Sequence, residues 1–371
     1  MTTMIENRTF PPNRSANSPA AAALASAFAL AMATASAHAA PQTVAEIALY
    51  TGADRQAVLE AGAMKEGALQ IYSTGTQNQP IVDAFAKRYP YVKVNFFRAD
   101  GSSLARRWIE EYKAGRFLAD VFDGGSTSLP PMRDAGVLQA YKSPEMAAMR
   151  EEGILGGPQG PLWANNYESY LSLGYNTKLI SEAEVPKTYD DLLDPKWQGK
   201  MAIAGSNTLG NWIGAAVLDK GEDYVRKLGA QKVKIFNVSG RAVANLVVSG
   251  EVPLSPAIFD SHIANSKSEG ASVAWRALGG VYSTTGAVAL ALKAPHPSAA
   301  MLYIDFMLSK TGQEMFKQIG YASARNDIEA KEKPSKIYYL AQRPNYPEES
   351  EKWSLLGRQV FGRGEALKDA K

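Results

Sequence analysis

The stretch IYSTGTQNQPIVDAFAKRYPYVKV, residues 71–94, decides the fold of this chain. Apolar and polar residues alternate up to Tyr72, and residues 73–76, Ser-Thr-Gly-Thr, interrupt that pattern. After Pro80 the apolar residues are spaced as on one face of a helix, and the alternation resumes over residues 92–96. The stretch therefore predicts a strand, a hydroxyl-rich loop, a helix and a second strand.

The same unit recurs in the second half of the chain. Residues 199–210 predict a strand that ends in Gly205-Ser206-Asn207-Thr208 before an apolar helix. Residues 232–252 predict a strand, then Ser239-Gly240-Arg241 at the head of another helix. Strands that alternate with helices indicate an α/β fold with a mainly parallel sheet, whose ligands bind beyond the carboxyl ends of the strands. Two such sheets that face each other would form a cleft.

Two helices are predicted in the last quarter of the chain. An amphipathic pattern extends from Ala299 to Ile319, after a long extended segment over residues 282–292. A further helix is expected around Trp353 and Leu356, packed on one lobe. The role of residues 331–371 stays open at this point.

The N-terminus has the pattern of a secretory signal peptide. Arg8 and Arg14 precede a short apolar run, and small residues follow up to Ala39, so we expect cleavage after residue 39. Removal of residues 1–39 takes away two basic groups and one acid, and the formal charge falls from +3 to +2. This balance argues against a nucleic-acid partner. We expect a soluble periplasmic protein.

The absence of cysteine limits the chemistry of the chain. The sequence contains no cysteine, so it has no disulfide, thiolate metal site or cysteine nucleophile. It has no G-x-S-x-G or H-E-x-x-H motif, and only His262 and His296 remain after removal of the signal peptide. We therefore do not expect an enzyme, and we expect no cofactor and no resident metal.

Three segments resemble a known family. PKTYDDLLDPKWQGKMAI, residues 186–203, is similar to the signature that opens the second lobe of bacterial extracellular solute-binding proteins, the receptors of ABC importers. LKAPHPSAAMLYIDFMLSKTGQEMFKQIG, residues 292–320, resembles a helix of the same family. YTGADRQAVLEAGAMKEGALQIY, residues 50–72, is similar to the N-terminal entry of its ferric-iron or AfuA-like branch.

This resemblance implies a two-lobe type II periplasmic binding protein fold with two crossing hinge strands. We expect the crossings near residues 164–173 and 282–290. The expected division is 40–168 for the first part of lobe 1, 169–281 for lobe 2, 282–330 for the hinge strand and return to lobe 1, and 331–371 for a C-terminal helical segment. The lobes would close on a small solute, and the closed form would dock on an inner-membrane permease as a monomer.

The resemblance also bears on iron. Relatives that bind ferric iron directly use two adjacent tyrosines, and the matching positions here are Asp260 and Ser261. Their first-lobe ligands match Thr76 and Gly125. Ferric iron is a hard cation that requires anionic oxygen donors, so this chain is not expected to bind it directly. In those relatives an anion lies on a second-lobe helix start, which matches Ser206-Asn207-Thr208 here.

The predicted ligand is therefore a small anion. Backbone N–H groups at the helix start and the hydroxyls of Thr74, Thr76 and Ser126 would donate to it, and Arg241 would supply the charge. A phosphonate, a phosphate ester, a carboxylate and a metal–anion complex all stay open. So does a sensory role in place of transport. The residues expected to bind the ligand are Thr74, Thr76, Ser126, Trp163, Tyr167, Ser206, Asn207, Thr208, Arg241, Asp260 and Tyr282.

Overall fold

The computed structural model describes residues 43–75, 78–99, 101–328, 334–343 and 345–362. The expected signal peptide and Thr76 lie outside these residues. No helix among the described residues is both long enough and apolar enough to cross a membrane.

The N-terminal part confirms the unit predicted from residues 71–94. Strand β1 (Ala68–Ser73) leads through the loop into α4 (Gln79–Arg88), and β2 (Lys93–Arg98) returns parallel to β1. The other elements of this part are α2 (Val44–Leu49), α3 (Arg55–Glu66), α5 (Gly101–Lys113), β3 (Val121–Gly125), the 3-10 turn η1 (Ser126–Ser128), α6 (Leu129–Asp134), β4 (Leu138–Gln139) and β5 (Ile154–Gly157).

The middle of the chain contains the long strand β6 (Gly160–Asn176) and the second set of predicted units. These units are β7 (Ala202–Ala204) with α7 (Asn207–Lys220), and β8 (Lys234–Phe236) with α9 (Gly240–Ser249). The remaining elements of this part are α8 (Glu222–Leu228), β9 (Leu254–Phe259), α10 (Asp260–Ser268), β10 (Val273–Arg276) and β11 (Gly280–Ala291).

The predicted helix from Ala299 to Ile319 is wrong in one respect, because the chain forms two helices there. Helix α11 (Pro297–Leu308) ends before Ser309, and α12 (Lys310–Gln318) begins after it. The backbone of Ser309 is extended, and its hydroxyl accepts a hydrogen bond from the Gly312 N–H and so caps α12. Strand β12 (Lys336–Tyr338), the 3-10 turn η7 (Leu340–Gln342) and α13 (Tyr346–Phe361) complete the described chain.

The main sheet is mixed, whereas the sequence predicted a mainly parallel one. Strands β2, β1 and β3 are parallel to one another, but β6 and β11 pair antiparallel along most of their length. Strand β11 also pairs antiparallel with β3, and β6 with β9 and β10. The sheet order is β10-β6-β11-β3-β1-β2, and β7 pairs with β8 in a separate two-stranded sheet. The difference arises because the two long strands pass between two sets of α/β units.

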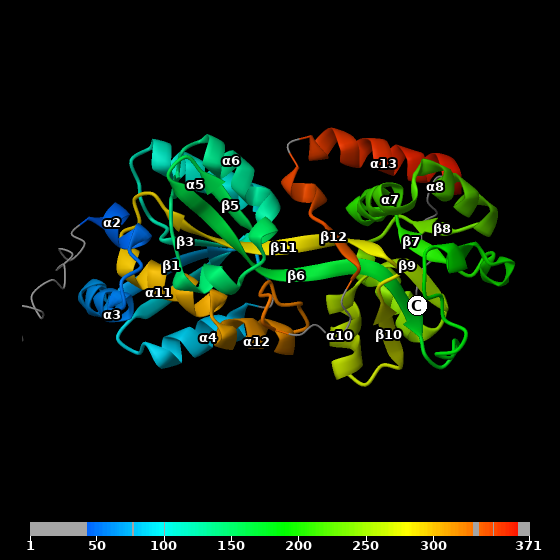
Figure 1. The fold of residues 1–371 in the computed structure, drawn as a ribbon, viewed down its shortest axis with the longest axis horizontal. Coiled ribbons are helices and arrows are strands. Elements are labelled where there is room, and N and C mark those ends of the chain that lie inside the picture. Colours follow the sequence, from blue (N-terminus) through cyan, green and yellow to red (C-terminus); the bar gives the residue numbers. More distant parts are fainter. Residues whose placement is uncertain (1–42, 76–77, 100, 329–333, 344, 363–371) are drawn as a thin grey trace, which may run out of the picture. The chain divides into compact units, whose positions relative to one another are not determined.

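Strands β6 and β11 connect two groups of hydrophobic clusters, and Figure 1 shows them side by side across the middle of the described chain. On β6, Trp163 and Tyr167 belong to clusters with α4, α5 and α11, whereas Leu171 and Tyr175 belong to a cluster with α7. Between these groups, residues 168–170 of β6 pair with residues 283–285 of β11. All six of these residues carry polar groups, so we call them the polar crossing. The expected lobe boundaries at 168/169 and 281/282 stay our proposal.

Helix α13 packs closely along α7 (Figure 1). Gly214 of α7 lies against the Trp353 ring, where an added Cβ would come within 2.4 Å of a ring carbon. Gly357 of α13 likewise lies against Leu209 of α7. The C-terminal helix predicted around Trp353 is therefore present, and glycines on both helices allow the close approach.

We expect Gly214→Ala to destabilise the protein by about 1–3 kcal/mol, although Gly→Ala within a helix is normally stabilising. The added methyl group would overlap Trp353 and displace α13 from α7. Thermal unfolding measures the effect. Leu218→Ala, on an exposed part of α7, serves as the control and should change stability much less. A gain of stability in Gly214→Ala would show that α13 does not pack this closely.

Candidate functional site

A cavity of ≈1060 Å³ lies at the carboxyl ends of three parallel strands. Thr74 follows β1, Arg98 ends β2 and Gly125 ends β3, and all three line the cavity. Residues of α5 and η1 form much of the remaining wall, and Asn207 from the start of α7 contributes to it as well. This is the position at which open α/β sheets bind their ligands.

The structure brings two of the predicted ligand-binding residues, Thr74 and Asn207, to this cavity. The Thr74 hydroxyl accepts a hydrogen bond from the Gly125 N–H at 2.8 Å, which leaves its own O–H available to donate. Ser206 caps α7, since its hydroxyl accepts from the Thr208 N–H. Thr208 is buried directly behind this cap.

Ser126 lies beside the cavity but points away from it. Its hydroxyl is hydrogen bonded to the Thr285 hydroxyl of β11 at 2.6 Å, and the side chain is buried. The next two residues, Thr127 and Ser128, line the cavity instead. Ser126 therefore connects the cavity wall to the polar crossing.

The three aromatic residues predicted to bind the ligand do not line this cavity. Trp163 packs in a hydrophobic cluster with its indole N–H unpaired among the described residues. Tyr167 stacks on Tyr321 with ring centroids 4.1 Å apart, and Tyr282 is buried in the cluster around α7. The sheet is covered on both faces here, so a large aromatic ring on either face of these strands becomes part of a core.

Arg241 contacts the backbone of the neighbouring helix rather than the cavity. Its Nη1 donates to the His262 carbonyl oxygen at 3.0 Å. The His262 ring lies close to Gly240, at the start of α9, and its Nδ1 has no partner among the described residues. Burial and the nearby Arg241 charge lower the pKa of His262 to about 4, so this ring is neutral at physiological pH.

Asp260, another predicted ligand-binding residue, is bonded to the polar crossing. One carboxylate oxygen accepts hydrogen bonds from the Ser169 hydroxyl, the Tyr170 N–H and the Ser261 N–H, at 2.7–2.9 Å. Burial raises the pKa of Asp260 to about 7, and the negative charge of Glu168 acts in the same direction. Asp260 thus joins the start of α10 to β6.

Glu168 is the second buried carboxylate at the polar crossing. It forms an ion pair with Arg150 at 3.2 Å and accepts hydrogen bonds from the hydroxyls of Tyr170 and Tyr339. Tyr339 belongs to the C-terminal segment, which therefore also contacts the hinge strands. No sequence pattern indicated this contact.

A buried carboxylate that the sequence did not reveal lies behind the cavity. Asp123 accepts hydrogen bonds from the side chains of Asn78, Asn166 and Tyr303, and its backbone carbonyl accepts from the Thr74 N–H. Burial raises the pKa of Asp123 to about 6. The cluster joins the loop after β1 to β6 and α11, so it supports the cavity wall from inside.

Three cations that line the cavity were also missed. Arg98 ends β2, and Arg106 and Lys113 lie two turns apart on α5. An exposed cation on a helix looks the same in the sequence whether it faces solvent or a cavity. The only available signal was the position of Arg98 at the carboxyl end of a strand.

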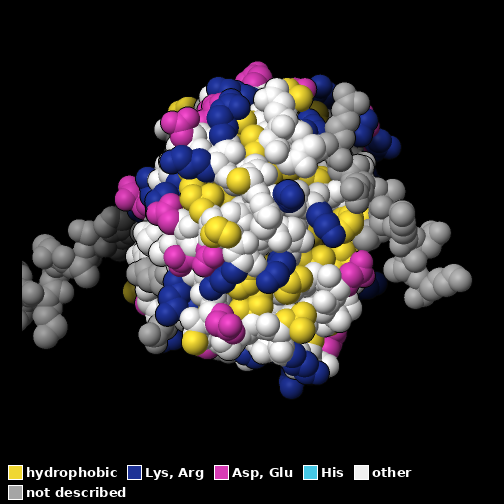
Figure 2. Space-filling model, turned by 90° about the vertical axis from the view of Figure 1, so that its right-hand side faces the viewer, with side chains coloured by type: hydrophobic (Ala, Val, Ile, Leu, Met, Phe, Trp, Pro, Cys, Tyr) yellow, Lys and Arg dark blue, Asp and Glu magenta, His cyan; other side chains and the backbone are white. Residues whose placement is uncertain are grey.

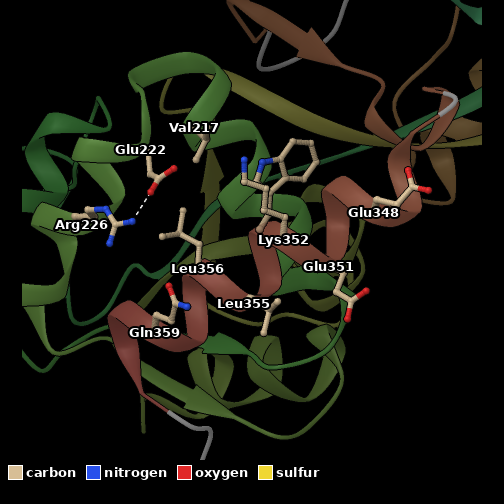
Figure 3. A pocket seen from close by; sticks show the side chains of 10 residues that line it. Val217, Glu222, Arg226, Glu348, Glu351, Lys352, Leu355, Leu356 and Gln359 are labelled. Carbon is tan, nitrogen blue, oxygen red and sulfur yellow. Dashed lines mark hydrogen bonds and ion pairs between the residues drawn. The ribbon is translucent and has the colours of Figure 1, made fainter.

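A second groove, of ≈480 Å³, lies between α13 and the helices α7 and α8 (Figure 3). An ion pair between Glu222 and Arg226 lies at its wall. Val217 in this groove is ten residues along α7 from Asn207, or about 15 Å along the helix axis. The groove is therefore separate from the cavity at the strand ends.

Acidic and basic side chains alternate over the end of the molecule that carries α8 and β8. Figure 2 shows Lys and Arg interspersed there with Asp, Glu and small apolar patches.

Among the described residues, no group of three or more His, Cys, Asp or Glu side chains is arranged to hold a metal ion.

A family model described as bacterial extracellular solute-binding protein matches residues 118–344. This chain belongs to that family. The match includes β3, both hinge strands and η7. Solute-binding proteins of this family are non-catalytic transport components that deliver small ligands to ABC permeases.

Proteins that are similar to this solute-binding protein confirm the predicted fold. An uncharacterized protein of Haemophilus influenzae is 25% identical over 274 residues, 69% of this chain and 77% of the relative. Iron-bound HitA from Pseudomonas aeruginosa has a TM-score of 0.61 at 24% identity, covering 79% of this chain and 99% of HitA. AfuA from Actinobacillus pleuropneumoniae, with exogenous fructose-6-phosphate bound, has a TM-score of 0.53 at 25% identity. The match covers 80% of this chain and 96% of AfuA.

We expect Asp260→Asn to reduce the pH dependence of stability. The fold raises the pKa of this carboxyl from 3.8 to about 7, so the folded state disfavours the ionised form. Its contribution to stability is therefore largest at low pH and declines as the pH rises toward 7. Asparagine retains an acceptor for the three donors but carries no charge.

Thermal unfolding between pH 5 and pH 8 measures this effect. The wild-type protein should lose stability over this range, and Asp260→Asn should lose less. Asp134→Asn, at an exposed position, should follow the wild type. An unchanged slope in Asp260→Asn would contradict a raised pKa at this residue.

Proposed function

We propose that this protein is the periplasmic receptor of an ABC importer and binds a small anionic solute in the cavity at the strand ends. The solute is a phosphonate, a phosphate ester or a carboxylate. The expected signal peptide, residues 1–39, supports the periplasmic location, and the protein acts as a monomer without a cofactor.

The observation that carries this proposal is the charge of the cavity wall. Arg98, Arg106 and Lys113 line the cavity, and none of them forms an ion pair with another described residue. Exposed cations that converge on a concave surface attract anions and raise their local concentration. The hydroxyls of Thr74, Thr127 and Ser128 add neutral hydrogen-bond donors to the same wall.

The start of α7 supports the proposal from the opposite wall. Asn207 is the first residue of this 14-residue helix, whose N-terminal end carries a partial positive charge. Ser206 and Thr208 belong to the same turn. Arg241 enters the proposal as the charge that the second lobe contributes when the two lobes close on the solute.

One of the similar proteins, AfuA, is consistent with an anion. AfuA, at 25% identity, holds fructose-6-phosphate, a phosphate ester. The described cavity lining contains a single carboxylate, Glu110, and no tyrosine or histidine. That donor set does not suit ferric iron, which prefers several anionic oxygen ligands. We therefore favour a metal-free anion over ferric iron as the transported solute.

A thermal-shift screen of the purified protein tests this proposal. The panel contains phosphonates, sugar phosphates, dicarboxylates, polyamines and ferric iron with and without phosphate or citrate. A ligand at a hundredfold excess over its Kd stabilises the folded state by ~2.7 kcal/mol. We expect a shift with a metal-free organic anion. A shift that requires ferric iron, or one produced by polyamines alone, would contradict the proposal.

We expect Arg241→Ala to weaken the binding of that anion at least about tenfold, since hydrogen bonds to charged groups contribute about 1.5–3 kcal/mol. Isothermal titration calorimetry measures the affinity. Lys227→Ala, at an exposed position on α8, is the control and should leave the affinity unchanged. Equal affinities in the wild type and Arg241→Ala would remove Arg241 from the site.

A further inference from the structure

The basic side chains on the two sides of helix α5 differ in whether they form ion pairs. Arg107 faces away from the cavity, pairs with Glu111 at 2.7 Å and lies over the Phe97 ring at 4.3 Å. Arg106 and Lys113 face the cavity and form no ion pair among the described residues. The second side is therefore the one on which positive charge is left uncompensated.

An acidic residue is close enough in the sequence to pair with Arg106 or Lys113, so the absence of ion pairs is not due to composition. Glu110 lies four residues after Arg106 and three before Lys113, which are the spacings at which helix side chains form ion pairs. Neither pair is within ion-pair distance in this structure. Both cations thus remain directed to the cavity that they line.

The described lining consequently has an excess of positive charge. Three cations, Arg98, Arg106 and Lys113, stand against one carboxylate, Glu110, which gives a net charge of +2. At this wall a monoanionic solute would leave one positive charge uncompensated, whereas a solute with two negative charges would neutralise the wall. The Arg241 charge that the second lobe contributes on closure adds to the same preference. The cost of enclosing a charge without a partner favours the second case.

We propose that the solute is doubly charged on one head group, as a phosphate monoester or a phosphonate. This inference rests on the proposed function and specifies its ligand. Such a head group has three oxygen atoms that accept hydrogen bonds, and the wall offers guanidinium forks together with the hydroxyls of Thr74, Thr127 and Ser128. A single carboxylate has fewer acceptor positions and only one charge.

A matched pair of ligands tests the charge directly. Glucose 6-phosphate and glucose 6-sulfate differ little in shape, but at about pH 8.5 the phosphate ester carries two charges, because its second pKa is about 6, and the sulfate ester carries one. Isothermal titration calorimetry should give at least about tenfold tighter binding of the phosphate ester. Ethylphosphonate, in a third titration, distinguishes a phosphonate receptor from a phosphate-ester receptor.

The outcomes separate this inference from the proposed function. Equal affinity for the phosphate and the sulfate ester would overturn the double charge and leave an anion receptor in place. If the protein binds a dicarboxylate but neither glucose 6-phosphate nor ethylphosphonate, the proposal of a phosphate or phosphonate head group is wrong. If no anion binds, the proposed function itself fails.

Variants of the wall provide a second test. Arg106→Gln and Lys113→Gln should each weaken the doubly charged ligand about tenfold and reduce the preference over the sulfate ester. Glu110→Gln should strengthen binding severalfold, because it removes the only negative charge of the described lining. Lys93→Gln, at the other end of β2 from Arg98, is the matched control. It should change the affinity for neither the phosphate ester nor the sulfate ester. Weaker binding in Glu110→Gln would contradict the charge count.

Discussion

The antiparallel pairing of β6 with β11 is the constraint on which the rest of the structure depends. Each strand has apolar residues at both ends and polar residues in the middle, so hydrophobic clusters form on either side of the polar crossing. Buried polar groups have to be hydrogen bonded, and here their partners come from every neighbouring part of the chain. Ser126 reaches Thr285 from the cavity wall, Asp260 reaches Ser169 from α10, and Tyr339 reaches Glu168 from the C-terminal segment.

This arrangement explains why Ser126 and Asp260, both predicted to bind the ligand, are absent from the lining of the candidate cavity. Ser126 and Asp260 lie next to cavity or cleft elements, but their side chains bond to the hinge strands. A buried polar group on a hinge strand costs free energy if it has no hydrogen-bond partner. Nearby polar side chains therefore turn toward the strands and supply that partner. Thr127 and Ser128, which follow Ser126 in the sequence, line the cavity instead.

Much of the fold could be predicted from the sequence because its signals are local. The strand, loop, helix and strand of residues 71–94 are set by alternation, by Pro80 and by helical spacing within a short window. The mixed sheet could not be predicted in the same way, since pairing of β6 with β11 joins residues far apart in the chain. The loop hydroxyls at Thr74 and the start of α7 were recognisable because small polar residues mark strand ends and helix caps. Trp163 and Tyr282 were not distinguishable from cleft aromatics, because core and cleft positions show the same alternation.

The contact between the glycines of α7 and helix α13 has a consequence for the order of folding. Helix α7 contributes Asn207 to the cavity, and the side of α7 that carries Gly214 stays exposed until α13, the last of the described helices, has docked on it. Contacts between distant segments form late, because the intervening chain has to be ordered first. Packing of α7 against α13 therefore requires that residues 346–361 have been synthesised, and it follows the formation of contacts between elements closer together in the chain.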